Sequence, residues 1–170
     1  MAALRGALAQ FSGDLVGAES AFRESAETRS AIGSVEAVPT WLELAAVEAQ
    51  LQNYSGLSET LHHVLRNCRP GEIERSAGPL ALARLVLLAQ RRDWRGWTEC
   101  LRDARQQLAA TPEPSELCFV FARKAAELAA EAGQEGKAAE ARDLADRYGS
   151  VEPEMPSMTV VDGMLARLPG

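Results

Sequence analysis

The sequence predicts an all-α protein built from about four antiparallel pairs of helices. The strong helix formers Ala and Leu are abundant in its 170 residues, of which 46% are hydrophobic and 25% charged. No stretch combines β-branched residues with the alternation that is typical of a strand. Turn signals divide the chain into segments whose apolar residues recur at three- and four-residue spacing. We therefore expect a single domain of packed amphipathic helices.

The first half of the chain shows helix boundaries at regular intervals. Gly13-Asp14 interrupts the first apolar segment and Gly33 closes the second. Thr40 with Glu43 has the spacing of a capping box, in which hydroxyl and carboxylate each bond the other residue's amide. Asn53 to Gly56 predicts a tight turn.

Similar signals continue through the second half. Arg69-Pro70-Gly71 predicts a helix end, Asp93 is a candidate N-cap, and residues 111–115 form a break with two prolines. Gly133 fits the position just after a helix. The expected result is eight helices in units of about 1–33, 38–70, 75–110 and 115–148, followed by a linker and short amphipathic segment at 149–170.

These units share an internal register. In the second helix of each unit, the residue expected to face its partner helix recurs at intervals of 39, 40 and 41 residues: Ala18, Leu57, Trp97 and Ala138. Twelve residues before these lie the expected partners in the first helices: Gly6, Ala45, Leu85 and Ala126. Small residues at a crossing point allow two helices to approach closely. The pattern predicts repeated helical hairpins, with Arg142 interrupting the apolar pattern of the fourth.

The second unit resembles a tetratricopeptide repeat in these residues: Trp41, Leu44, Ala45, Tyr54, Leu57, Leu61 and Val64. The resemblance spans about residues 1–148 and implies a right-handed solenoid of stacked hairpins. With a period near 40 residues, the chain is similar to the longer variant found in maltose-regulator-like ATPases and large bacterial signalling kinases. It implies a non-enzymatic scaffold that binds a protein or peptide in its concave groove, within bacterial signalling or regulation.

The same resemblance implies which residues line that groove. They belong to the first helices of units two, three and four and are expected to be exposed: Leu42, Glu43, Ala46, Gln50, Leu82, Val86, Gln90, Arg123, Lys124 and Glu127. Arg123 and Lys124 would add charge selectivity to an apolar surface. The alternative is that the repeat period alone produces these matches.

A second functional hypothesis is a ligand-sensing array within a larger signalling ATPase or kinase system. Trp94 and Trp97, flanked by arginines, would then form a platform for a small ligand. The alternative is that both rings fill the core between units. The arginine-rich stretch 66–105 carries nine Arg against five acids, so an acidic partner peptide competes with a mixed solvated surface as its explanation.

The motifs of catalysis are missing from the sequence. No phosphate-binding loop or dinucleotide fingerprint occurs, and His62-His63 is the only histidine site. Cys68, Cys100 and Cys118 are too widely spaced for a zinc site and suit a reducing compartment. We expect no enzymatic activity, no cofactor and no metal.

The charge and the hydropathy pattern exclude two further classes of partner. A net charge of −6 argues against general nucleic-acid binding, and the most apolar stretch, PLALARLVLLA, is too short to span a membrane. No signal peptide is evident, so a cytoplasmic location is expected. The segment 159–168 is amphipathic, and either caps the last hairpin or docks on another chain.

Overall fold

The computed structural model describes residues 2–109 and 115–148, and within them the protein is all-α, with nine helices and no strand. The amphipathic segment predicted at 159–168 lies outside these residues. In chain order the helices are α1 (Ala2–Phe11), α2 (Leu15–Ala31), α3 (Ala37–Gln50), α4 (Tyr54–Asn67), α5 (Pro70–Arg75), α6 (Ala77–Gln90), α7 (Trp94–Ala109), α8 (Glu116–Glu131) and α9 (Glu135–Tyr148).

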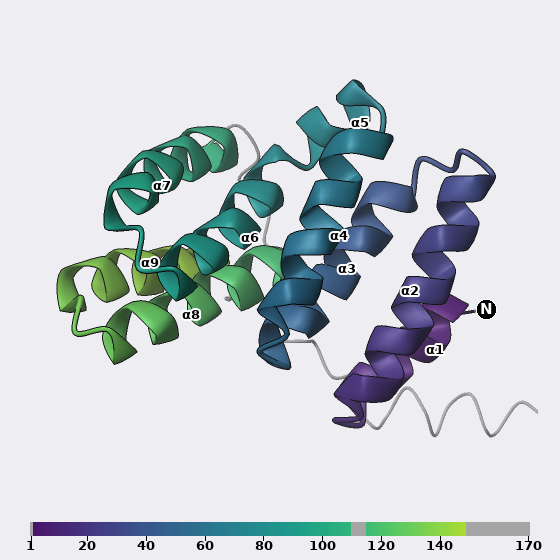
Figure 1. Cartoon of the computed structure of the whole chain (residues 1–170), viewed down its shortest axis with the longest axis horizontal. Coiled ribbons are helices and arrows are strands. Elements are labelled where there is room, and N and C mark those ends of the chain that lie inside the picture. Colours follow the sequence, from purple (N-terminus) through teal and green to yellow (C-terminus); the bar gives the residue numbers. More distant parts are fainter. Residues whose placement is uncertain (1, 110–114, 149–170) are drawn as a thin grey trace, which may run out of the picture.

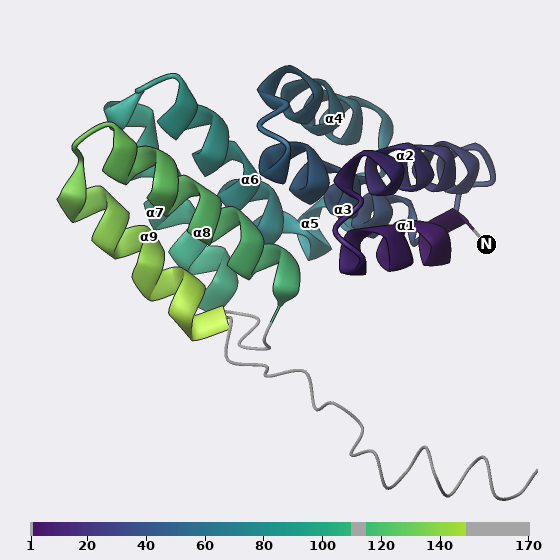
Figure 2. The same ribbon diagram turned by 90° about the horizontal axis from the view of Figure 1, so that it is seen from below.

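The helices are arranged along the molecule largely in chain order. α1 and α2 lie at one end, α3 and α4 follow, and α7, α8 and α9 lie at the other end (Figure 1). Consecutive helices pack on each other as far as α4, which then contacts α6. Beyond this point the order changes, because α8 packs on α6 and also contacts α3. Figure 2 shows α8 and α9 side by side in front of α6 and α7.

The core is continuous and centres on α3 and α6. Both helices are rich in Ala and Leu, and most of their residues are buried. A helix that is apolar on all sides needs neighbours on all sides. α3 has them in α2, α4, α6 and α8, whereas the charged α9 is covered mainly by α8.

The same turn links α1 to α2, α3 to α4, α6 to α7 and α8 to α9. One residue in each has a positive φ: Gly13 at 82°, Gln52 at 59°, Arg92 at 57° and Gly133 at 72°. The next N–H donates to the carbonyl five residues earlier, at 2.8 to 2.9 Å. This is the helix-ending geometry that glycine favours, so the expected boundaries at Gly13 and Gly133 are confirmed.

Three of these turns also carry the same side-chain cap. Asp14, Asn53 and Asp93 each accept a hydrogen bond from the backbone N–H three residues later, at 2.9, 3.0 and 2.9 Å. The donors are Gly17, Gly56 and Gly96. A Cβ at any of these glycines would overlap the capping side chain, so the close approach requires glycine. The prediction that Asp93 is an N-cap is confirmed.

One predicted boundary is wrong, and another is followed by an unexpected helix. α3 begins at Ala37, and the Thr40 hydroxyl donates to the Glu36 carbonyl at 2.9 Å instead of forming a capping box. Pro39 falls in the first turn, where its missing N–H is not needed. The helix end predicted at Arg69-Pro70-Gly71 is confirmed, since α4 ends at Asn67. Pro70 then starts the short helix α5, which the sequence did not predict.

The eight residues predicted to face one another within the hairpins are all buried. At Gly6 the helices approach closely, because a Cβ there would lie 2.9 Å from a ring carbon of Phe22. Leu85 and Trp97, the bulky third pair, are both 0% exposed. The small residues therefore lie where helices need to approach closely.

The outer side of α1 has no neighbour among the described residues and is apolar. Leu4 and Leu8 are each 62% exposed and Phe11 is 93% exposed. They are spaced at four and three residues, so they form one stripe along the helix.

Membrane-crossing helices are not found in the described part of the chain, because no helix there combines the necessary length and hydrophobicity.

Candidate functional site: a groove along α8

Four of the ten predicted groove residues are buried, so the expectation that they are exposed is wrong. Leu42 and Ala46 of α3 are each 1% exposed, and Leu82 and Val86 of α6 are 0% exposed. The physical reason is the position of α8, which packs on α6 and reaches α3. It covers the helix faces that a more open stack would leave free.

Two further predicted residues lie away from the surface described below. Gln90 is exposed at the C-terminal end of α6. Glu43 is half-buried in α3, and burial raises the pKa of its carboxyl group, partly offset by Arg29. Neither side chain lines a hollow together with the remaining four.

Those four, Gln50, Arg123, Lys124 and Glu127, come together in space. Gln50, the last residue of α3, and the three residues of α8 line one open hollow of about 350 Å³. Phe119 and Val120, one turn earlier on α8, complete it. The contact between α3 and α8 thus joins residues that are more than 70 positions apart in the sequence.

A second hollow of about 470 Å³ continues the first along α8. It shares Phe119, Arg123 and Glu127 with its neighbour and extends to the α9 residues Arg142 and Asp146. Its remaining lining is small and apolar: Ala126, Ala130 and Ala145. We call the two hollows together the α8 groove.

Each of the three cations on this groove is paired with a carboxylate. Glu127 forms ion pairs with both neighbouring cations, with Arg123 Nε 3.4 Å from Oε1 and Lys124 Nζ 3.2 Å from Oε2. Arg142 pairs with Glu135, Nη2 to Oε2, at 3.6 Å. A partner that supplies its own carboxylate can replace Glu127 at little cost, since exposed pairs of this kind contribute about 0–1 kcal/mol.

Phe119 is the residue that the sequence interpretation missed. Its half-buried ring lines both hollows. The Arg123 guanidinium carbon lies 6.0 Å from the ring centre, within cation–π range. The spacing of an aromatic residue and an Arg at i and i+4 on one helix was the available signal.

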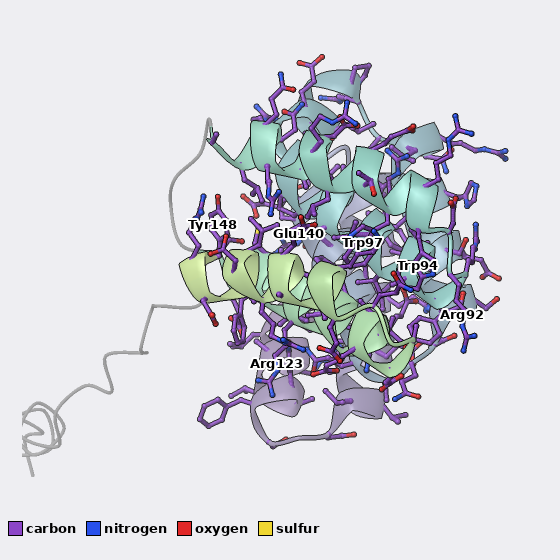
Figure 3. The ribbon with its side chains drawn as sticks, turned by 90° about the vertical axis from the view of Figure 1, so that its left-hand side faces the viewer. Arg92, Trp94, Trp97, Arg123, Glu140 and Tyr148 are labelled. Carbon is purple, nitrogen blue, oxygen red and sulfur yellow. The ribbon has the colours of Figure 1, made fainter. Side chains whose placement is uncertain are left out.

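The tryptophan pair lies apart from this groove. Figure 3 shows Arg123 on the opposite side of α9 from Trp94 and Trp97. Trp97 is 0% exposed, and its ring meets the half-buried ring of Trp94 edge-on at 5.9 Å between centroids. Trp97 is therefore part of the core, and only Trp94 offers a ring edge to solvent.

The histidines and acidic residues form no metal site in the described ranges, where no group of three or more potential ligands lies close enough to hold an ion. His63 instead packs on Trp41, with 4.3 Å between ring centroids, and His62 is exposed. What the groove offers is a surface with an aromatic ring, small apolar residues and charges of both signs.

Comparison of this chain with protein-family models, with curated protein sequences and with solved structures finds no match.

Proposed function

We propose that this protein is a non-enzymatic, tetratricopeptide-like interaction module that binds a peptide or protein segment in the α8 groove. In this proposal about four helical hairpins stack as a right-handed solenoid. The turns inside the four hairpins support it, since they share one hydrogen-bonding geometry and their N-cap positions recur at the 39-, 40- and 41-residue intervals of the facing residues. A fifth turn of this geometry, at Gly33, links the first hairpin to the second. The close packing of α8 on α6 would make this short stack more compact than a long array of repeats.

The observation that carries the binding proposal is the convergence of α3 and α8 on one open surface. Gln50 supplies hydrogen bonds, Phe119 an apolar ring, and Arg123 a cation held over that ring. Interfaces draw much of their binding energy from such aromatic and Arg anchors. The groove therefore suits a segment with an apolar side chain followed by a carboxylate.

The test is a selection of peptides from a random displayed library, followed by affinity measurements on variants. We expect peptides with an apolar residue near an acidic one, and a loss of affinity of roughly tenfold or more for Phe119→Ala and Arg123→Glu. Arg102→Glu on α7 is the matched control, because it changes the charge equally at an exposed site. Selected peptides that bind all three variants as well as the parent would contradict the proposal.

A ligand-sensing array is the second candidate, and the partial exposure of Trp94 favours it. A sugar or nucleotide that stacks on this ring would shift the tryptophan emission in a saturable way. The Trp94→Phe variant should abolish that shift. Emission that stays unchanged across both classes of metabolite would argue against a sensor.

A further inference from the structure

A third open hollow lies between α4 and α6, and it shares no residue with the α8 groove. The two helices lie side by side (Figure 1) and contact each other. Each contributes one stripe with the spacing i, i+3, i+4, i+7, and together they enclose about 230 Å³. The lining residues are Ser58, Leu61, His62 and Leu65 from α4 and Arg84, Leu87, Leu88 and Arg91 from α6. We call this surface the α4–α6 groove.

The floor of the α4–α6 groove is made of leucines. Leu61 is nearly buried, Leu87 and Leu88 are half-buried, and Leu65 remains 52% exposed. Leu65 is uncovered because α4 meets α6 only along one edge and has no comparable packing with α7. An apolar floor with one strongly exposed leucine is a surface that gains free energy when another apolar side chain covers it.

Two arginines stand on the α6 side of this floor. Arg84 and Arg91 are exposed and seven residues apart, which is about 10.5 Å along a helix. Neither forms an ion pair with any residue that the structure describes, and no acidic residue lines the groove. The α8 groove differs in this respect, since Glu127 there pairs with both neighbouring cations.

His62 adds a polar edge on the opposite side. Its Nδ1 lies 2.9 Å from the Ser58 carbonyl oxygen, which leaves Nε2 directed away from its own helix backbone. The groove thus combines an apolar centre with cationic and polar edges. Its α6 side belongs to the stretch 66–105, in which nine arginines outnumber five acids.

We propose that the α4–α6 groove docks an acidic amphipathic helix of a partner protein. Two carboxylates seven residues apart on that helix have the spacing of Arg84 and Arg91, because both pairs span two helical turns. If the carboxylates occupy positions i and i+7 of the partner helix, aliphatic side chains at i+3 and i+4 then lie over Leu65, Leu87 and Leu88. This is recognition of a helix by a groove, with charge fixing the register and apolar burial contributing affinity.

The leucine floor distinguishes this occupant from a simple anion. A phosphate group or a nucleic acid would pair with the arginines but would leave Leu65 exposed to water. The acidic helix uses both features, so its affinity depends on Leu65 as well as on Arg84 and Arg91.

The experiment measures fluorescence anisotropy of a labelled, alanine-based helical peptide of about 18 residues. The probe carries two Glu seven positions apart, with Leu at the third and fourth positions between them. We expect saturable binding that weakens roughly tenfold or more in the Arg84→Glu/Arg91→Glu variant and in Leu65→Asp. A second peptide, with Lys in place of both Glu, should bind the double variant better than it binds the parent protein.

Matched controls separate docking from general electrostatics and from unfolding. Arg102→Glu/Arg105→Glu on α7 changes the net charge by the same amount, and it should leave the probe affinity within about twofold. Far-ultraviolet circular dichroism and the melting temperature identify folded variants. A double variant that prefers the Lys peptide while the parent prefers the Glu peptide must be folded, so this reversal of preference separates docking from unfolding.

Three results would each overturn the proposal. One is equal loss of affinity in the α7 control, and another is the absence of saturable binding by the acidic probe. The third is an oligonucleotide that binds more tightly than the probe and ignores Leu65→Asp, because a nucleic-acid surface would then explain the arginines.

Discussion

The guanidinium Nη2 of Arg23 lies 2.8 Å from Oε1 of Glu48, and this is the only ion pair of the described residues in which one side chain is completely buried. Glu48 lies at the junction of α2, α3 and α4, where the second carboxylate oxygen has no hydrogen-bond partner among the described atoms. Burial raises the pKa of Glu48 to about 7, since the nearby Thr60 hydroxyl and Arg23 offset only part of the loss of hydration and Glu19 adds a like charge.

This raised pKa predicts that the protein loses stability as the pH increases. Between about pH 4.5 and about pH 7 the folded state holds the Glu48 proton more tightly than the unfolded chain does. The stability that this group contributes is therefore fully present below about pH 4.5 and is lost as the pH rises through about 7, by at most about 3 kcal/mol. Urea unfolding of the parent and of Glu48→Gln measures it, and the variant should show the smaller pH dependence.

The exposed carboxyl of Glu59 on the neighbouring helix provides the control. Glu59→Gln should retain the parent's pH dependence. If Glu48→Gln and the parent have parallel stability profiles across this range, Glu48 does not titrate in the folded protein as the structure requires.

The repeated turns predict two stabilising substitutions. Gln52 and Arg92 adopt a positive φ, which costs a residue with a side chain about 1–2 kcal/mol, whereas Gly13 and Gly133 occupy the same position without that cost. Gln52→Gly and Arg92→Gly should each raise the free energy of unfolding by about 0.5–1 kcal/mol. Gly13→Ala and Gly133→Ala should lower it, and a gain in either alanine variant would contradict the shared geometry.

The contact between α1 and α2 predicts opposite effects for one substitution at two helical glycines. Gly6→Ala places a methyl group against the buried ring of Phe22, so we expect a net loss of about 1 kcal/mol despite the better helix propensity. Gly136 of α9 has no atom within 4 Å of the corresponding position, and Gly136→Ala should be neutral or stabilising by up to about 1 kcal/mol. Thermal unfolding of both variants compares them directly, and equal melting temperatures would show that Gly6 is not required for packing.

The three cysteines should differ in their reactivity toward a thiol reagent. Cys100 and Cys118 are 5% and 1% exposed, and burial raises the pKa of all three thiols. Only the half-buried Cys68 should react in the native protein, and slowly, because the thiolate is the reactive form. Absorbance measurements with an aromatic disulfide should count one thiol in buffer and three in denaturant, and Cys68→Ser should leave none in buffer.

Local features of the fold were predictable from the sequence because they depend on a few neighbouring residues. Asp93 caps α7 and Gly133 follows α8 as expected, since each depends on the backbone of its own turn. The capping box at Thr40 failed because α3 starts earlier, at Ala37, so that Thr40 lies inside the helix. Its hydroxyl donates to the Glu36 carbonyl and accepts from Arg29 of the preceding helix, each at 2.9 Å. A competing contact of this kind has no signature in the local sequence.

The candidate site was predictable only in part for the same reason. The register placed Arg123, Lys124 and Glu127 on one face of a helix, and the structure adds Gln50 from a distant one. Leu82 was expected in the groove because its helix was assigned an open face, but the packing of α8 on α6 buries it. Which helix covers which is a tertiary property, set by the fit of whole surfaces rather than by the period of one segment.

The apolar stripe on α1 affects how readily the protein precipitates at high salt. Sulfate and similar salts strengthen the association of exposed apolar surfaces, so we expect Leu4, Leu8 and Phe11 to promote contact between two molecules during salting-out. The precipitation threshold should accordingly follow the polarity of this stripe more closely than the net charge of −6. With Gln at position 8 the protein should stay dissolved at a higher ammonium sulfate concentration and melt at the same temperature, because the fold makes little use of that side chain.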